Sequence, residues 1–197
     1  MPVELTHLIG TSLVRLERHH AAAMEIDLRH LGAGDAAAFN AAVHESLDEL
    51  RPWMPWAGAE PLPVAERLEL IRRWERERAE GGDESFGIFV DGAVVGACGL
   101  HHRIGAGGLE IGYWVRTADT GRGIATEAVR QACAVAFADP SIDRVEIHHD
   151  RANAASGRVP AKLGFERVAE RRDAPTAPGE DGVEVVWRLT REAWAGE

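Results

Sequence analysis

Short apolar runs, several of them alternating with polar residues, recur along the chain and predict β-strands. Asp91-Gly92 separates the second run from the third, and an Asp-Gly pair between two apolar runs predicts a tight hairpin. The runs are E-I-D-L-R-H-L (25–31), S-F-G-I-F-V (85–90), A-V-V-G-A-C-G-L (93–100), L-E-I-G-Y-W-V (109–115), R-V-E-I-H-H (144–149), F-E-R-V-A-E (165–170) and V-E-V-V-W-R-L (183–189).

Longer stretches with helical spacing of their apolar residues lie between these runs. They predict helices over about 36–47, 64–80 and 124–138. Asp35 is placed to cap the first of these helices. A shorter helix is expected within N-A-A-S-G-R-V-P-A-K-L-G-F (153–165). Because proline in a helix interior costs about 3 kcal/mol, we expect this helix to begin near Ser156, with Pro160 in its first turn and Asn153 in a loop.

The predicted order of elements is β-α-α-β-β-β-α-β-α-β-β. An early run of consecutive strands excludes a regular βαβ alternation, so the fold class is α/β with a single mixed sheet flanked by helices. We assign residues 25–197 to one domain. Residues 1–24 form an N-terminal extension without a clear pattern.

The stretch T-G-R-G-I-A-T-E-A-V (120–129) is a glycine-rich turn that opens a helix. Such a turn presents unpaired backbone N–H groups to an anion, and the helix dipole favours negative charge there. A dinucleotide-binding fingerprint needs a third glycine where this chain has Thr126, and a P-loop needs Gly-Lys followed by Ser or Thr. Both nucleotide folds are therefore disfavoured, and a tight turn without a ligand stays open as an alternative.

The formal net charge of -10 argues against a nucleic-acid partner, which would require a basic surface. The chain has neither an apolar run long enough to span a bilayer nor the layout of a signal peptide, so we expect a cytoplasmic protein without a membrane partner. Cys98 and Cys133 lie in small apolar surroundings and are predicted to be reduced, buried packing residues. Three His-His pairs lack metal-ligand spacing, and no metal site is expected.

Four motifs, taken together, resemble the GNAT superfamily of acyltransferases. They are R-P-W-M-P-W (51–56), E-I-G-Y-W-V (110–115), T-G-R-G-I-A-T-E-A (120–128) and N-A-A-S-G-R-V-P-A-K-L-G-F (153–165), and they occur in the order of the family. Within the superfamily, the chain is similar to the Rim-type branch, which acetylates the N-terminal amines of ribosomal proteins. The resemblance covers about residues 25–194. It implies the acyl-CoA N-acyltransferase fold, whose mixed sheet is mostly antiparallel, and acetyl-CoA as the cofactor.

The resemblance also implies where acetyl-CoA is held. The glycine-rich turn would bind the pyrophosphate through its backbone, and the end of the preceding strand, Val115 and Arg116, would pair with the pantetheine amides. Asn153 would contact the cofactor arm, and Ser156 would lie near the sulfur and donate a proton to the leaving thiolate. The family usually has Gln or Arg in place of Thr120. The residues of the turn are Thr120, Gly121, Arg122, Gly123, Ile124, Ala125 and Thr126.

On the acceptor side, the loop that carries Trp53 and Trp56 would wall the cleft, with Tyr113 beside it. Loop tryptophans also serve as packing anchors, and both roles are compatible. Glu110 is the candidate base because its strand faces the cleft in the family. Glu110 could instead be an exposed strand residue without a role. In that case a water relay, or Glu170 or Asp173 further along the chain, would remove the proton.

The sequence therefore predicts an acetyl-CoA-dependent N-acetyltransferase in which a primary amine attacks the thioester directly in a ternary complex. The acceptor suggested by the branch is a protein N-terminal amine. A small-molecule amine, such as an antibiotic or a metabolite, is the second reading, and a non-catalytic acyl-CoA-binding or interaction protein of the same fold is the third. The oligomeric state, including a homodimer, stays open.

Overall fold

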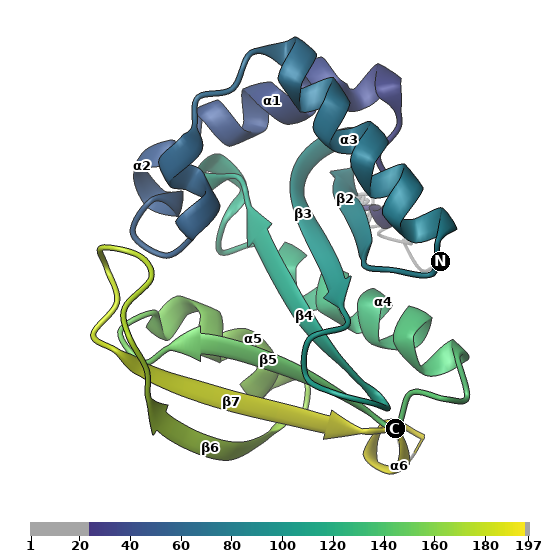
Figure 1. The fold of residues 1–197 in the computed structure, drawn as a ribbon, viewed down its shortest axis with the longest axis vertical. Helices are drawn as coiled ribbons and strands as arrows, with labels where there is room; N and C mark the ends of the chain where they lie inside the picture. The colour runs from purple at the N-terminus through teal and green to yellow at the C-terminus, as the bar shows by residue number, and fades with distance from the viewer. Residues whose placement is uncertain (1–23, 196–197) are drawn as a thin grey trace, which may run out of the picture.

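One seven-stranded sheet runs through the computed structural model, which describes residues 24–195 (Figure 1). Of the N-terminal extension assigned to residues 1–24, only Met24 lies within the described residues. The strands follow the order β1-β2-β3-β4-β5-β7-β6, and every neighbouring pair is antiparallel except β4 with β5. Their bounds are β1 Ile26–His30, β2 Glu84–Val90, β3 Ala93–His101, β4 Gly108–Val115, β5 Arg144–Asp150, β6 Glu166–Arg172 and β7 Val183–Thr190. The predicted mixed sheet is confirmed.

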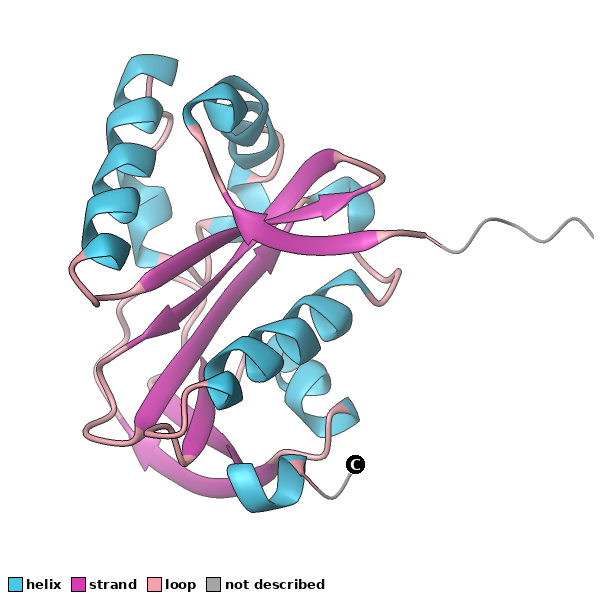
Figure 2. Cartoon of the chain, turned by 90° about the vertical axis from the view of Figure 1, so that its right-hand side faces the viewer, coloured by secondary structure: helices cyan, strands magenta, loops and turns pink. Residues whose placement is uncertain are grey.

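Helices cover both faces of this sheet (Figure 2). Helices α1 and α3 lie on one face, and α4 lies on the other. The bounds are α1 Ala36–His44, α2 Leu47–Leu50, α3 Val64–Ala79, α4 Ile124–Ala138, α5 Ala154–Lys162 and α6 Arg191–Trp194, with 3-10 turns η1 Ala33–Asp35, η2 Pro55–Ala59 and η3 Thr117–Asp119. Within residues 24–195, none of these helices has the length and apolar character needed to cross a membrane.

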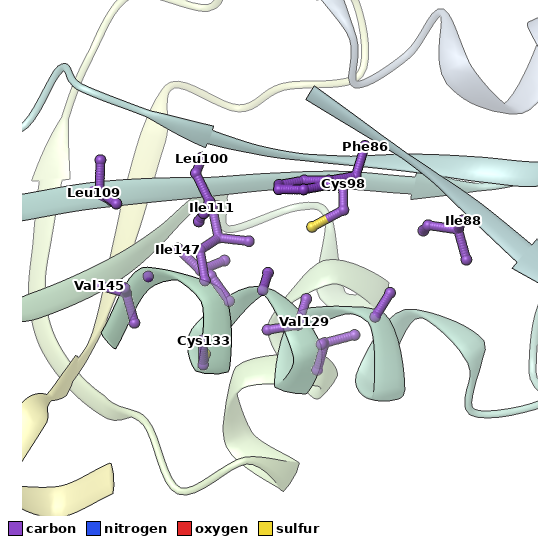
Figure 3. Close-up of a cluster of buried hydrophobic side chains, with 14 of the residues drawn as sticks. Phe86, Ile88, Cys98, Leu100, Leu109, Ile111, Val129, Cys133, Val145 and Ile147 are labelled. Carbon is purple, nitrogen blue, oxygen red and sulfur yellow. The ribbon is translucent and has the colours of Figure 1, made fainter. Parts of the chain in front are cut away.

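The packing core between the sheet and α4 contains both cysteines (Figure 3). Cys98 is 2% exposed and Cys133 is 0% exposed, which confirms that they are packing residues. Burial raises the pKa of the Cys98 thiol, so this group stays protonated and cannot act as a nucleophile at neutral pH. A second core, on the opposite face, packs α1 and α3 against the sheet through Phe39, Val43, Ile71, Phe89 and Trp114.

Strands β4 and β5 pair over three residues only, from Gly108 opposite Arg144 to Glu110 opposite Glu146. Beyond that point the two strands diverge and divide the sheet into an arm of β1–β4 and an arm of β5, β7 and β6 (Figure 1). On its other edge β4 stays paired with β3 as far as Val115. The far half of β4 therefore has one edge that faces the gap between the arms.

The Asp91-Gly92 hairpin is confirmed, because both residues have the positive φ that such a turn requires, 49° and 82°. The predicted helix over 36–47 is interrupted at Ser46, whose hydroxyl donates to the Ala42 carbonyl at 2.9 Å and so competes with the helix. Asp35 does not cap α1 with its side chain, because its carboxylate binds Arg29 at 2.9 Å instead.

The predicted start of the short helix near Ser156 is wrong. Helix α5 begins at Ala154, and Asn153 is its N-cap, with its side-chain oxygen accepting a hydrogen bond from the Ser156 N–H at 3.2 Å. Pro160 consequently lies inside the helix rather than in its first turn.

Asp150, at the end of β5, fastens three segments of the second arm to one another. Its carboxylate accepts hydrogen bonds from the backbone N–H groups of Ala152 at 2.8 Å, Asp181 at 3.1 Å, Gly182 at 2.9 Å and Val183 at 3.2 Å. Burial opposes ionisation of this carboxyl, but the backbone hydrogen bonds outweigh it and hold the pKa of Asp150 below its ordinary value. The carboxylate thus joins the approach to α5 to the loop before β7.

We predict that Asp150→Ala lowers the free energy of unfolding by about 2 kcal/mol at pH 7, because it leaves several backbone donors without their charged acceptor. Since the folded-state pKa is lowered, this stabilisation is present above the unfolded-state value of about 3.9 and is lost as the pH falls through the folded-state value. Urea unfolding at pH 7 and at pH 3 measures both effects. The exposed Asp27, replaced by Ala, is the matched control. Equal stabilities of the two variants at pH 7 would contradict this assignment.

Candidate active site

A cavity of about 870 Å³ lies where the two arms separate. It is lined from the first arm by β3, β4 and the loop after α2, and from the second arm by β5, the start of α5 and the loop between β6 and β7. Six of the site residues predicted from the sequence line this cavity: Trp53, Trp56, Glu110, Tyr113, Asn153 and Ser156.

The glycine-rich turn lies at the N-terminus of α4 and offers unpaired backbone donors. The six N–H groups from Gly121 to Thr126 donate no hydrogen bond to any other residue within 24–195. Gly121 and Gly123 have φ values of 76° and 82°, and a Cβ added to either would meet no atom within 4 Å. Left-handed glycines, open space and unpaired donors at a helix N-terminus fit an anion such as a pyrophosphate.

The side chains of this turn are less available than its backbone. The hydroxyl of Thr120 donates to the Thr117 carbonyl at 2.9 Å. Arg122 donates to Asp119 at 2.6 Å, and Arg116 donates to the other oxygen of the same buried carboxylate, also at 2.6 Å. Both arginine side chains therefore hold η3 in place, so the attraction for an anion rests mainly on the backbone.

The edge of β4 that faces the gap carries free peptide groups. The Arg116 N–H donates to the Val95 carbonyl at 2.6 Å, while the register places Val115 opposite Gly96 and Tyr113 opposite Cys98. Because hydrogen bonding alternates along an antiparallel pair, the peptide groups of Val115 and Tyr113 point away from β3 and into the gap.

Arg116 differs from Val115 in this respect. Its N–H is taken by Val95, and its carbonyl accepts from the Asp119 N–H at 2.8 Å. The Arg116 N–H is therefore not available to pantetheine amides, whereas the peptide groups of Val115 and Tyr113 face the gap.

Tyr113 and Ser156 meet across the opening between the arms. The Tyr113 hydroxyl donates to the Ser156 carbonyl at 2.9 Å and lies 3.1 Å from the Ser156 Oγ. Burial raises the pKa of Tyr113, so its hydroxyl stays protonated at neutral pH. This contact joins β4 to α5, and it brings two hydroxyl groups together beside the cavity.

Glu110 is embedded in a charged cluster that the sequence analysis did not foresee. Arg103 donates to both of its carboxylate oxygens, at 2.8 Å and 2.5 Å, and His148 Nδ1 lies 3.9 Å from Glu110 Oε2. His148 also contacts Glu146 at 2.8 Å and Glu184 at 3.1 Å. A signal was present in the sequence, because the alternating Arg144, Glu146 and His148 must share one face of their strand.

The charge of Glu146 is stabilised within this cluster. Burial of the carboxyl opposes ionisation, but the hydrogen bonds from His148 and Arg188 outweigh it and lower the pKa of Glu146. The alternative bases lie outside this charged cluster. Glu170 is tied to Arg151 at 3.3 Å and to Arg167, while Asp173 lines the cavity.

Aromatic side chains form the wall of the cavity on the first arm. Trp114 packs between Phe39, at 5.8 Å between ring centroids, and Trp56, at 6.2 Å. Trp56 is 39% exposed, so part of its face is available to a ligand while the rest packs. Both roles considered for the loop tryptophans are compatible with this placement.

The two arms also touch at the rim of the cavity. The Gly179 N–H, from the loop before β7, donates to the Pro52 carbonyl at 2.8 Å. A Cβ at position 179 would lie 2.7 Å from that carbonyl oxygen, so only glycine allows this approach. This contact joins the loop before β7 to the loop after α2.

A family model described as the acetyltransferase (GNAT) domain matches residues 25–166. The chain belongs to the GNAT acetyltransferase family. The expectation of an acetyl-CoA-dependent N-acetyltransferase is thereby confirmed at the level of the family. A protein of Bacillus subtilis (strain 168) that carries the name ribosomal N-acetyltransferase YdaF is 28% identical over 173 residues, which cover 87% of this chain and 94% of that relative.

Solved structures of GNAT enzymes have the same fold. RimJ of Mycobacterium smegmatis, solved with a coenzyme A disulfide, is 25% identical with a TM-score of 0.74, and the match covers 85% of this chain and 82% of that one. RimL, an α-N-protein acetyltransferase of ribosomal L7/L12 solved with coenzyme A, has a TM-score of 0.77 at 18% identity, covering 85% and 95%. The predicted fold and the resemblance to the Rim-type branch are confirmed.

We predict that Gly123→Ala destabilises the protein by about 1 kcal/mol, because an L-residue is strained at its left-handed φ although space is open around it. Gly34→Ala is the matched control, since position 34 is equally open and does not have such a φ. Thermal or urea unfolding of the two variants measures the difference. If Gly123→Ala were as stable as Gly34→Ala, the turn would not require a left-handed residue.

Proposed function

We propose that the protein transfers an acetyl group from acetyl-CoA to the N-terminal amine of a protein, by direct attack of the amine in a ternary complex. The observation that carries the proposal is the row of unpaired N–H groups from Gly121 to Thr126, adjoining the end of the free edge of β4. A pyrophosphate would match the N–H donors of the turn, and an amide-containing arm would match the donors and acceptors along the edge of β4.

Each part of the site has a role in this proposal. The turn would hold the pyrophosphate, Val115 and Tyr113 would pair with the amides of the arm, and Asn153 would keep α5 in place by capping it. The cofactor would supply an activated thioester. Ser156 Oγ would donate its proton to the departing sulfur as the carbon–sulfur bond breaks and the amide bond forms.

The amine must give up a proton to become a nucleophile. An α-amino group has an ordinary pKa near 8, so a fraction of it is already neutral at pH 7. Glu110, which is 12% exposed in its side chain and lines the cavity, would take the remaining proton directly or through water.

A peptide N-terminus is the proposed acceptor because one similar protein carries the name of a ribosomal N-acetyltransferase and another that of an α-N-protein acetyltransferase of ribosomal L7/L12. The half-exposed face of Trp56 offers apolar contact to the first side chain of such a peptide. A small-molecule amine is the second candidate, and the Gly179–Pro52 contact would favour it if that contact limits the entry of a peptide. An inert acyl-CoA-binding protein is the third.

The first test is thermal unfolding with acetyl-CoA, coenzyme A or NAD. A ligand at about 100 times its dissociation constant stabilises the native state by roughly 2.7 kcal/mol, which raises the unfolding temperature by a few degrees. We expect a shift with both coenzyme A ligands, none with NAD, and a reduced shift for Gly123→Ala relative to Gly34→Ala. Absence of a shift with coenzyme A would refute the cofactor assignment.

The second test compares acceptors and Ser156→Ala. We expect acetylation of short peptides with a free N-terminus, no acetylation of N-terminally blocked peptides, and a loss of about a hundredfold in kcat for Ser156→Ala with coenzyme A binding retained. Mass spectrometry locates the acetyl group and a thiol assay gives the rate. Turnover of small amines alone would favour the second candidate, and binding without any turnover would favour the third.

A further inference from the structure

Pro160 occupies a position in α5 that is unfavourable for proline. The helix spans Ala154–Lys162 and Pro160 lies in its interior, where the side chain is fully buried. Proline at such a position removes one helical hydrogen bond and pushes the carbonyl four residues earlier away from the helix. That carbonyl belongs to Ser156.

The carbonyl released by Pro160 is the one that Tyr113 uses. In an uninterrupted helix the Ser156 carbonyl would accept from the N–H of residue 160. Here it accepts from the Tyr113 hydroxyl at 2.9 Å. The lost helical bond is therefore replaced by a bond to the opposite arm of the sheet.

This replacement fixes the arrangement of both hydroxyl groups. A phenol has one proton, and sharing it between the Ser156 carbonyl at 2.9 Å and Ser156 Oγ at 3.1 Å leaves the proton of the serine hydroxyl free for transfer. Ser156 Oγ is thereby held at one place beside the cavity. The same bond sets the distance between β4 and α5 at the opening.

We propose that Pro160 is a positioning residue, which leaves the Ser156 carbonyl to Tyr113 and through this contact orients the Ser156 hydroxyl for proton donation. The inference rests on the proposed function, in which Ser156 is the proton donor. Pro160 would thus contribute to the reaction through Tyr113, without contacting the substrates.

The experiment uses Pro160→Ala, Tyr113→Phe, the double variant, and Arg158→Ala as a control on an exposed position of the same helix. Rates are measured with acetyl-CoA and a short peptide that begins with a free alanine. We expect Pro160→Ala to reduce kcat about tenfold, with the KM for acetyl-CoA within about twofold of the unsubstituted protein. In the Tyr113→Phe background the same change should have no further effect, because the two residues act through one contact.

Tyr113 also gives a readout that does not depend on activity, since it is the only tyrosine in the sequence. With tyrosine labelled by carbon-13 at Cζ, one NMR signal reports the hydrogen bonding of this hydroxyl. We expect the signal to move in Pro160→Ala, where the new N–H competes for the Ser156 carbonyl, and to stay in place in Arg158→Ala.

Several results would overturn the proposal. An unmoved Tyr113 signal in Pro160→Ala would show that the proline does not control the contact. A moved signal with an unchanged kcat, or additive losses in the double variant, would show that the contact does not position Ser156. If the unsubstituted protein acetylates no amine, the proposed function fails and the positioning role with it, while the NMR signal still decides whether the contact exists.

Discussion

The divergence of β4 from β5 after three residue pairs is the constraint on which the site depends. A strand inside a sheet satisfies its peptide groups on both edges, and unpaired buried peptide groups are unfavourable. The far half of β4 keeps β3 on one edge and exposes Tyr113 and Val115 on the other. The free edge of β4 therefore needs a ligand that pairs with it as a neighbouring strand would. The N-terminus of α4, at the end of the gap, needs an anion. Both demands are met by one elongated molecule with amides and a pyrophosphate.

A sheet that splits in this way needs contacts that hold its arms at a fixed separation. Tyr113 to Ser156 joins them at the opening, and Gly179 to Pro52 joins them at the rim. Asp150 links the second arm to both contacts, because its carboxylate binds the approach to α5 and the loop that carries Gly179. Besides the core that both arms share with α4, the contacts across the opening include the pair that is proposed to take part in the reaction.

Much of the fold followed from the sequence because strands, hairpin and helices are local patterns. Asp91-Gly92 between two apolar runs predicts a hairpin, and the glycine-rich turn predicts the start of α4. The partners of Glu110 could not be predicted from the sequence, because Arg103 and His148 belong to different elements and only the sheet order brings them together. The start of α5 was misplaced for a related reason. Proline is unfavourable inside a helix as a local rule, but Tyr113, on a distant strand, binds the carbonyl that Pro160 leaves without a helical partner.

The two sides of the site differ in the groups that do the recognition. On the cofactor side the groups belong to the backbone, and the sequence needs only glycines at two positions and a strand that ends at Val115. On the proposed acceptor side they would be side chains that line the cavity, among them Trp56, Glu110 and His148. Backbone recognition survives extensive substitution, whereas side-chain recognition changes with each residue. At 28% identity to a relative, substitutions among the cavity-lining side chains would therefore change the acceptor while the fold and the backbone groups of the turn stay the same.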